Sequence, residues 1–142
     1  MRIKITLLAL ITLFFVKSSF AQAVIKYRAS ACYWSTSKEA NGTPIWVKID
    51  NASNILVVLD EPKEKISIYS KTIQDLSIIA RYSMGADSAI HLYQYHMNCV
   101  DQDNKKCDAD LTLYRGTKNE HLEQLIINYY TIEYKFDMRP DE

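Results

Sequence analysis

The stretch Thr131–Met138, TIEYKFDM, alternates between polar and mainly apolar side chains. Because successive side chains of a β-strand point to opposite faces of a sheet, this alternation predicts a strand with one buried face and one solvent face. The buried face would carry Ile132, Tyr134, Phe136 and Met138. A strand of this kind needs neighbouring strands and a core to pack against, so the rest of the chain should supply them.

Short apolar or alternating runs recur along the chain, separated by turn sequences such as Asn41-Gly42-Thr43-Pro44. They predict strands at 24–35, 45–49, 55–60, 65–70, 74–82, 89–100, 107–115, 123–130 and 132–138. Connections this short leave no room for crossover helices, so the strands should be antiparallel. We therefore expect an all-β fold: a single antiparallel meander of about eight strands that closes into a small lipocalin-like barrel or a sandwich.

One segment fits two periodicities. Leu122, Leu125, Ile126 and Tyr129 also share one face of a helix. A helix at 119–130 therefore remains the alternative to a strand at 123–130.

Residues 1–21 have the three-part order of a secretory signal peptide. A basic start, MRIK, precedes an apolar run at Ile5–Val16, and Ala21 and Ala23 mark two cleavage positions. This run is too short to anchor the chain across about 30 Å of hydrocarbon. We expect a signal peptide at 1–21, a single antiparallel β domain at 22–142, and a periplasmic or secreted product with no membrane span after cleavage.

Charge argues against nucleic acid as a partner. Cleavage would remove Arg2, Lys4 and Lys17, which lowers the basic count from 17 to 14 against 17 acidic residues, a formal charge of −3. A nucleic-acid-binding domain usually carries a basic face or stripe, and none is visible in this sequence.

Three stretches follow one another through the C-terminal three-fifths of the chain: IYSKTIQDLSII (Ile68–Ile79), CVDQDNKKC (Cys99–Cys107) and LIINYYTIEYKF (Leu125–Phe136). In this order they resemble a group of small exported, uncharacterised β-proteins of Bacteroides-type bacteria. In that group a Tyr-Ser-Lys segment leads to a Cys-x-Asp-x-Asp-Gly-x-x-Cys hairpin and then to two aromatic strands. Asn104 stands here where the group has Gly. The resemblance implies a β fold and export, and it implies no activity.

The stretch Cys99–Cys107 predicts a β-hairpin whose register follows from its faces. With Gln102-Asp103-Asn104 as a three-residue loop, Cys99 lies opposite Cys107 and one face of the hairpin is apolar. A two-residue loop at Asp103-Asn104 would set Cys99 opposite Asp108 and mix the faces. The three-residue loop needs a left-handed residue at its third position, which Asn104 tolerates well.

Opposed cysteines in an oxidising compartment are within reach of bonding. We therefore expect Cys99 and Cys107 to form a cross-strand disulfide. The alternative is a reduced pair packed as small apolar side chains. Cys32 would remain as a buried free thiol or form an intermolecular link.

Several carboxylates near the hairpin invite a calcium interpretation, but their spacing is wrong. Counted from Asp101, the EF-hand positions for Gly and Glu hold Lys106 and Thr112. The acidic residues concerned are Asp101, Asp103, Asp108 and Asp110. Turn formation and solvated strand faces explain them without a metal.

No pattern points to zinc or to catalysis. His91 and His96 are an odd number of residues apart on one predicted strand and should point to opposite faces, and His121 stands alone. The chain holds only three glycines and lacks a Gly-x-Ser-x-Gly elbow and a phosphate-binding loop. We therefore expect no enzymatic activity, no catalytic residues, no metal and no cofactor.

Two non-enzymatic functions remain open. In the first, the barrel holds a small apolar molecule, which requires a cavity of about 300 Å³ or more lined by apolar groups. In the second, a solid-cored module binds another envelope protein or a glycan through exposed aromatic side chains. The aromatic candidates are Trp34, Trp46, Tyr93, Tyr95, Tyr129 and Tyr130. Ordinary core packing is the competing explanation for each of them.

Overall fold

The computed structural model describes residues 23–52, 54–89, 92–114 and 123–141, and this part of the chain consists of strands and their connections. The strands are β1 (Val24–Ser35), β2 (Val47–Lys48), β3 (Ile55–Asp60), β4 (Lys65–Tyr69), β5 (Ile73–Asp87), β6 (Leu92–Asp101), β7 (Lys106–Tyr114), β8 (Glu123–Tyr129) and β9 (Ile132–Pro140). Every pairing between them is antiparallel. The expected all-β antiparallel meander is confirmed.

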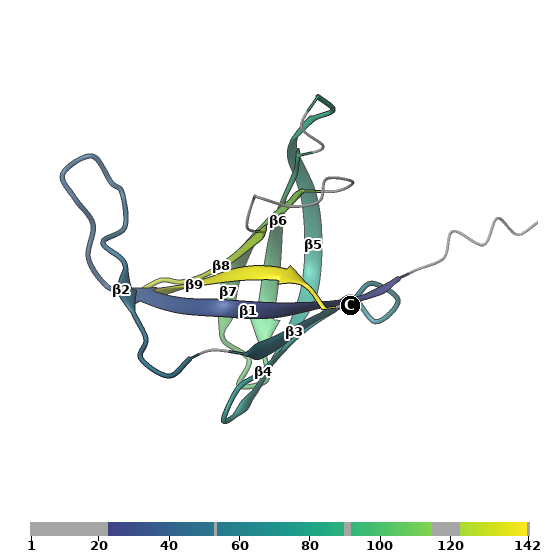
Figure 1. The fold of residues 1–142 in the computed structure, drawn as a ribbon, viewed down its shortest axis with the longest axis horizontal. Helices are drawn as coiled ribbons and strands as arrows, with labels where there is room; N and C mark the ends of the chain where they lie inside the picture. Colours follow the sequence, from purple (N-terminus) through teal and green to yellow (C-terminus); the bar gives the residue numbers. More distant parts are fainter. Residues whose placement is uncertain (1–22, 53, 90–91, 115–122, 142) are drawn as a thin grey trace, which may run out of the picture.

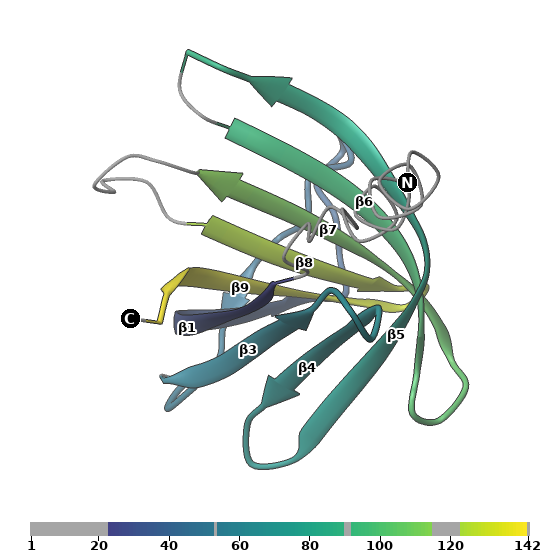
Figure 2. The same cartoon turned by 90° about the vertical axis from the view of Figure 1, so that its right-hand side faces the viewer.

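The sheet closes into a barrel because β1 pairs with β9 as well as with β3. Figures 1 and 2 show β1 and β9 side by side, with the other strands following in sequence order around the barrel. Eight strands form the barrel, and short β2 is an extra strand on β1. Of the two architectures expected from the sequence, the barrel is the one observed.

A β-bulge allows β1 to pair with β3 and with β9. The β1–β9 register shifts between Ala29 and Ala31, and the Ser30 hydroxyl donates to the Asp137 carbonyl oxygen at 3.3 Å. Before the bulge the buried β1 side chains are Tyr27 and Ala29, and after it Cys32 joins the same core cluster. The extra residue therefore switches the inward-facing set from odd to even positions, which keeps apolar side chains inside on both halves of a long strand.

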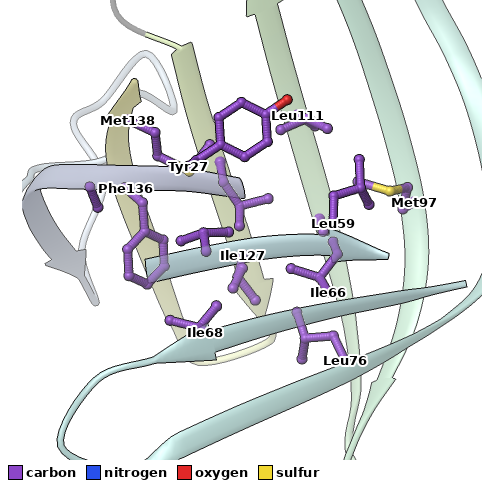
Figure 3. Packing of buried hydrophobic residues seen from close by; sticks show 14 of the residues in the cluster. Tyr27, Leu59, Ile66, Ile68, Leu76, Met97, Leu111, Ile127, Phe136 and Met138 are labelled. Carbon is purple, nitrogen blue, oxygen red and sulfur yellow. The ribbon is translucent and has the colours of Figure 1, made fainter. Parts of the chain in front are cut away.

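The barrel interior is filled with side chains from alternate positions of the surrounding strands (Figure 3). Its largest fully buried members are Val57, Ile66, Ile68, Leu76, Met97, Leu113, Leu125, Ile127 and Met138. The inward face predicted in Thr131–Met138 is confirmed, since Phe136 and Met138 belong to this core, but Glu133 and Asp137 on the expected solvent face are also buried. The middle of the barrel is therefore a packed core rather than a ligand chamber.

Strand bounds differ from the sequence-based expectation mainly in β5 and β2. β5 runs to Asp87 instead of ending at residue 82, because β6 pairs with it from Leu76 to Asp87 across two register shifts. β2 keeps only two of the five residues expected at 45–49. The segment 123–129 is strand β8, so the helical alternative is wrong there, and residues 119–122 lie outside the described part.

The predicted hairpin register is confirmed. Cys99 lies opposite Cys107, Met97 opposite Ala109 and Tyr95 opposite Leu111. The Asp101 amide donates to the Lys105 carbonyl oxygen at 2.9 Å, so residues 102–104 form the loop. Asn104 is left-handed, with a φ of 61°, as its position requires.

Export-related expectations fall outside this description. Residues 1–21, the expected signal peptide, are not among the described residues. Over the part that the structure describes, no helix has the length and apolarity to cross a membrane.

Truncation in the packed interior should be costly. Leu76→Ala removes a side chain that is 0% exposed, so we expect the free energy of unfolding in urea to fall by about 2–5 kcal/mol. The control is Ile79→Ala on the same strand, which is 68% exposed and should change stability by less than about 0.5 kcal/mol. Equal losses for both variants would contradict the assignment of the core.

Candidate functional site

The candidate site lies at the barrel end formed by the turns after β4, β6 and β8. The segment between β1 and β3, here called the arm (residues 36–52), leaves the barrel at the same end and stands out from it in Figure 1. The arm borders two neighbouring clefts. Neither lies in the middle of the barrel, which its own side chains fill.

Two cationic side chains fasten the arm to the outer face of the barrel. Lys135 on β9 places its Nζ 4.3 Å from the ring centroid of Tyr33 and 5.0 Å from the ring of Trp46. Lys38 Nζ lies 2.9 Å from Glu133 Oε1. Glu133 is buried although it faces away from the core, because the arm covers it. Cation–π contacts and partly buried ion pairs of this kind hold a loop in one position.

The first cleft, here called the arm cleft, has a volume of about 690 Å³. Core side chains contribute to its floor: Cys32, Ile55, Ile68 and Phe136. Ile49 and Ala52 of the arm pack against the core on one side, and the Ile49 amide donates to the Cys32 carbonyl oxygen at 2.9 Å. The arm cleft is therefore an apolar surface that the arm half covers.

The rim of the arm cleft is polar. It carries Asp50, Asn51, Asn54, Ser70, Lys71 and Gln74. Asn51 and Asn54 both have positive φ, at 59° and 63°, so the arm turns sharply where it crosses the barrel end. An apolar floor beneath a ring of polar groups is typical of sites for small, partly apolar molecules.

The second cleft, here called the turn cleft, has a volume of about 480 Å³. It lies beside the β8–β9 turn and is lined by the start of the arm, the start of β7 and residues 128–133. Most of its side chains are polar or charged, unlike the floor of the arm cleft.

A hydrogen-bonded chain of side chains separates the two clefts. Gln74 Nε2 donates to the Tyr129 hydroxyl at 2.6 Å, and that hydroxyl donates to Asp101 Oδ2 at 3.1 Å. Gln74 lines the arm cleft and Tyr129 lines the turn cleft. The ring of Tyr134 meets Tyr129 edge-on, with centroids 6.4 Å apart. This Gln74–Tyr129–Asp101 chain fixes three strands at the end of the barrel.

Asp101 ties the hairpin loop to this chain. Its Oδ1 accepts hydrogen bonds from the amides of Asp103 at 2.9 Å and Lys105 at 2.8 Å. Burial alone would raise the pKa of Asp101, but these amides and the Tyr129 hydroxyl outweigh it and lower that pKa. Burial, together with the nearby Cys107 and Asp101, raises the pKa of Tyr129. Tyr129 is therefore a neutral donor at physiological pH.

The three cysteines are buried free thiols in this structure. Burial raises the pKa of Cys99 to about 12 and that of Cys32 to about 11, and it also raises the pKa of Cys107. Thiols that stay protonated are poor nucleophiles, so none of the three has the character of a catalytic cysteine. The Cys99–Cys107 disulfide is not formed here, although the register sets the two residues opposite each other, and it stays a prediction.

The carboxylates considered for calcium do not converge. Asp101 bonds to its own loop, Asp108 accepts from Asn98 at 2.8 Å, and Asp110 contacts His96 Nδ1 at 2.7 Å. Asp103 is exposed in the loop. No group of three or more His, Cys, Asp or Glu side chains in the described ranges is placed to hold a metal ion. His91 and His121 lie outside those ranges.

The aromatic candidates separate into different roles. Tyr95 and Tyr129 pack against the core, Trp46 fastens the arm, and only Tyr130 is completely exposed. The arm itself was missed as a functional element, because its contacts with Glu133 and Lys135 join residues almost 100 positions apart. Its one visible signal is its length between two strand-like runs.

No family model, curated protein or solved structure matches the chain.

The hydrogen bonds that Asp101 accepts should make the free energy of unfolding depend on pH in the acid range. A folded-state pKa below the unfolded value of about 3.9 gives stability that is complete above that pH and is lost as pH falls through the lower folded value. Asp75, whose pKa hydrogen bonds from Lys65 and Ser67 lower, should act in the same direction. We expect Asp101→Asn to flatten the acid part of a plot of urea midpoint against pH.

Asp103→Asn is the matched control, because Asp103 lies in the same loop and is exposed. It should leave the acid dependence unchanged. Parallel plots for Asp101→Asn and Asp103→Asn would show that the hydrogen bonds of Asp101 do not contribute to the pH dependence of stability.

Proposed function

We propose that the protein is an exported binding protein that takes up a small, partly apolar molecule in the arm cleft. The observation that carries the proposal is the cleft of about 690 Å³ whose floor is made of core side chains. This volume lies within the range of about 300–1,000 Å³ that is usual for small-molecule sites.

The placement of the cleft supports a molecule that enters from the barrel end. The interior below Ile55 and Ile68 is packed, so a ligand would lie across the end and not along the barrel axis. Its apolar part would cover Phe136 and Cys32, and its polar part would reach the rim at Ser70 and Lys71. Burial of apolar surface on both sides would supply most of the binding free energy.

Gln74 is the best-placed polar group of the cleft. Its amide nitrogen is committed to the Tyr129 hydroxyl, which is itself held by Asp101. The amide oxygen is therefore oriented by the same chain of hydrogen bonds. A ligand hydroxyl or amine at this edge would find an acceptor that needs little reorganisation.

A second candidate is an envelope or secreted module that binds another protein or a glycan without a small ligand. The specific observation for it is the end of β5 beyond its pairing with β4, which stops at Ser77. Ile79, Tyr82 and Met84 project there and are each more than half exposed. Among the described residues no strand pairs with this edge, and such an edge with apolar side chains favours contact with a partner.

The expectations of export and of a Cys99–Cys107 disulfide belong to the same proposal. The signal-like residues 1–21 support export, and the opposed positions of the two cysteines support bonding in an oxidising compartment. Both thiols are buried and protonated in the folded barrel, so oxidation would have to precede closure.

Occupation of the arm cleft can be tested with a neutral naphthylamine fluorophore. We expect purified residues 22–142 to bind it saturably, with an emission increase, because apolar surface would surround the ring. Ala52→Trp should reduce this binding by about tenfold or more, because the indole fills the cleft beside Ile49.

Ala40→Trp is the matched control, since Ala40 is exposed in the arm and does not line the cleft. It should bind the fluorophore like the parent protein. Uptake that does not saturate, or that Ala52→Trp leaves unchanged, would favour the second candidate.

Export and oxidation can be tested together by mass spectrometry of protein recovered from the envelope or medium. We expect a chain that begins at Gln22 or Val24 and a non-reduced peptide pair joining Cys99 to Cys107. Full-length chain confined to the cytoplasm would contradict export. Free thiols at both positions in the exported protein, or a Cys32 link to either, would contradict the disulfide.

A further inference from the structure

We propose that the turn cleft is a second binding site, separate from the arm cleft, and that it takes a neutral polyhydroxylated molecule such as a short oligosaccharide. The inference goes beyond the proposed uptake of a small apolar molecule. It depends on the β8–β9 turn, on the charge balance of the cleft and on the way its walls are fixed.

The first observation is that the side chain of Tyr130 is completely exposed. It is 106% exposed, so its ring packs against nothing and contributes no burial to folding. The other described tyrosines are less exposed, including Tyr82 at 53% and Tyr69 at 42%. A large aromatic side chain that is entirely in water is a cost to solubility without a folding benefit, which points to a surface contact.

The conformation of the β8–β9 turn does not require a tyrosine at position 130. Tyr130 and Thr131 form a two-residue connection between the paired residues Tyr129 and Ile132. Two-residue hairpin loops favour Asn-Gly or related pairs, because the turns that match strand twist need positive φ. Neither Tyr130 nor Thr131 has positive φ. The sequence therefore departs from the favoured turn at the rim of the cleft, and such local departures concentrate at functional sites.

The charges of the cleft lining cancel. Lys38 and Lys106 contribute two positive charges, and Asp108 and Glu133 contribute two negative charges. A lining of this kind has no net field to select an anion or a cation. An apolar ligand would exclude water from lining groups such as Lys106 and Thr131, which is costly. A neutral ligand that both donates and accepts hydrogen bonds satisfies the lining best.

The polar wall is held in place before any ligand binds. Glu133 is buried, and its Oε1 contacts Lys38 Nζ at 2.9 Å and accepts from Asn128 Nδ2 at 3.2 Å. The Ser35 hydroxyl donates to the Ser37 carbonyl oxygen at 2.8 Å, which fixes the start of the arm. Side chains fixed in this way lose little entropy on binding, as a site for weakly bound polar ligands requires.

These features match the two faces of a sugar. The hydroxyl groups of a sugar ring donate and accept, and they suit the mixed lining of amide, carboxylate, ammonium and hydroxyl groups. Its C–H face is apolar and can lie flat against an exposed aromatic ring such as Tyr130. The volume of about 480 Å³ is within the range of small-molecule sites.

The test is a backbone amide NMR titration of residues 22–142 with maltose, cellobiose and chitobiose, each used separately. We expect at least one of them to cause saturable shifts at residues 35–38 and 128–133. Tyr130→Ala should weaken that binding by about tenfold or more, whereas Tyr130→Phe, which keeps the ring, should retain it. Because Tyr130 is fully exposed, neither variant should unfold the protein.

Ile73→Ala is the control, since Ile73 is a 59% exposed apolar side chain on β5 that lines neither cleft. It should bind the sugar normally. Ala52→Trp should also bind it normally, so that loss of the arm cleft and loss of the turn cleft are distinguishable. No saturable shift with any of the three sugars, shifts located at the arm cleft, or binding that Tyr130→Ala leaves unchanged would overturn the proposal.

Discussion

The pairing of β1 with β9 is the constraint on which the rest of the structure depends. It runs from Tyr27 opposite Pro140 to Ser35 opposite Glu133, and it turns an open meander into a closed barrel. Closure leaves no sheet edge along most of the structure and creates one shared interior for the inward-facing side chains. The bulge at β1 is what makes it compatible with the β1–β3 pairing, because it returns the apolar positions to the inside.

The same pairing places the arm at the end of the barrel. The arm leaves β1 directly after the segment that pairs with β9, so the β9 side chains Glu133 and Lys135 are the groups that fasten it. The arm then crosses the barrel end and borders both clefts. Between them the Gln74–Tyr129–Asp101 chain connects β5, β8 and β6. Two clefts can therefore lie close together without merging.

Local patterns in the sequence predicted the barrel strands well, because a half-buried strand requires alternation that is visible in the sequence. The hairpin register at Cys99–Cys107 was predictable for the same reason, since only a three-residue loop keeps one face apolar. Barrel and sandwich could not be separated, because closure depends on contacts between residues 27–35 and 133–140 that no local pattern reveals. The length of β5 was underestimated, because its end is exposed on both faces and does not alternate.

Most of the candidate site could not be predicted from local sequence patterns. Tyr129 and Tyr130 were noticed as aromatic residues, but Tyr129 is the middle member of a partly buried hydrogen-bonded chain and Tyr130 is entirely exposed. Neighbouring positions on a strand point in opposite directions, and the tight turn after them exaggerates the difference. The sequence of the arm shows only turn residues and the strand expected at 45–49. Nothing local indicates what holds the arm in place, because the side chains that fix it lie on β9.

Closure by the first and last strands also sets when the molecule can fold. Residues near position 30 find their β9 partners only after more than 100 further residues have been made, so the contact order of the barrel is high and its folding should be slow. Until the last strand is available, the apolar strands of the chain have no complete set of partners. This delay exposes strand edges that other molecules can pair with. The feature that completes the barrel is thus also the reason that its unfinished form needs protection from aggregation.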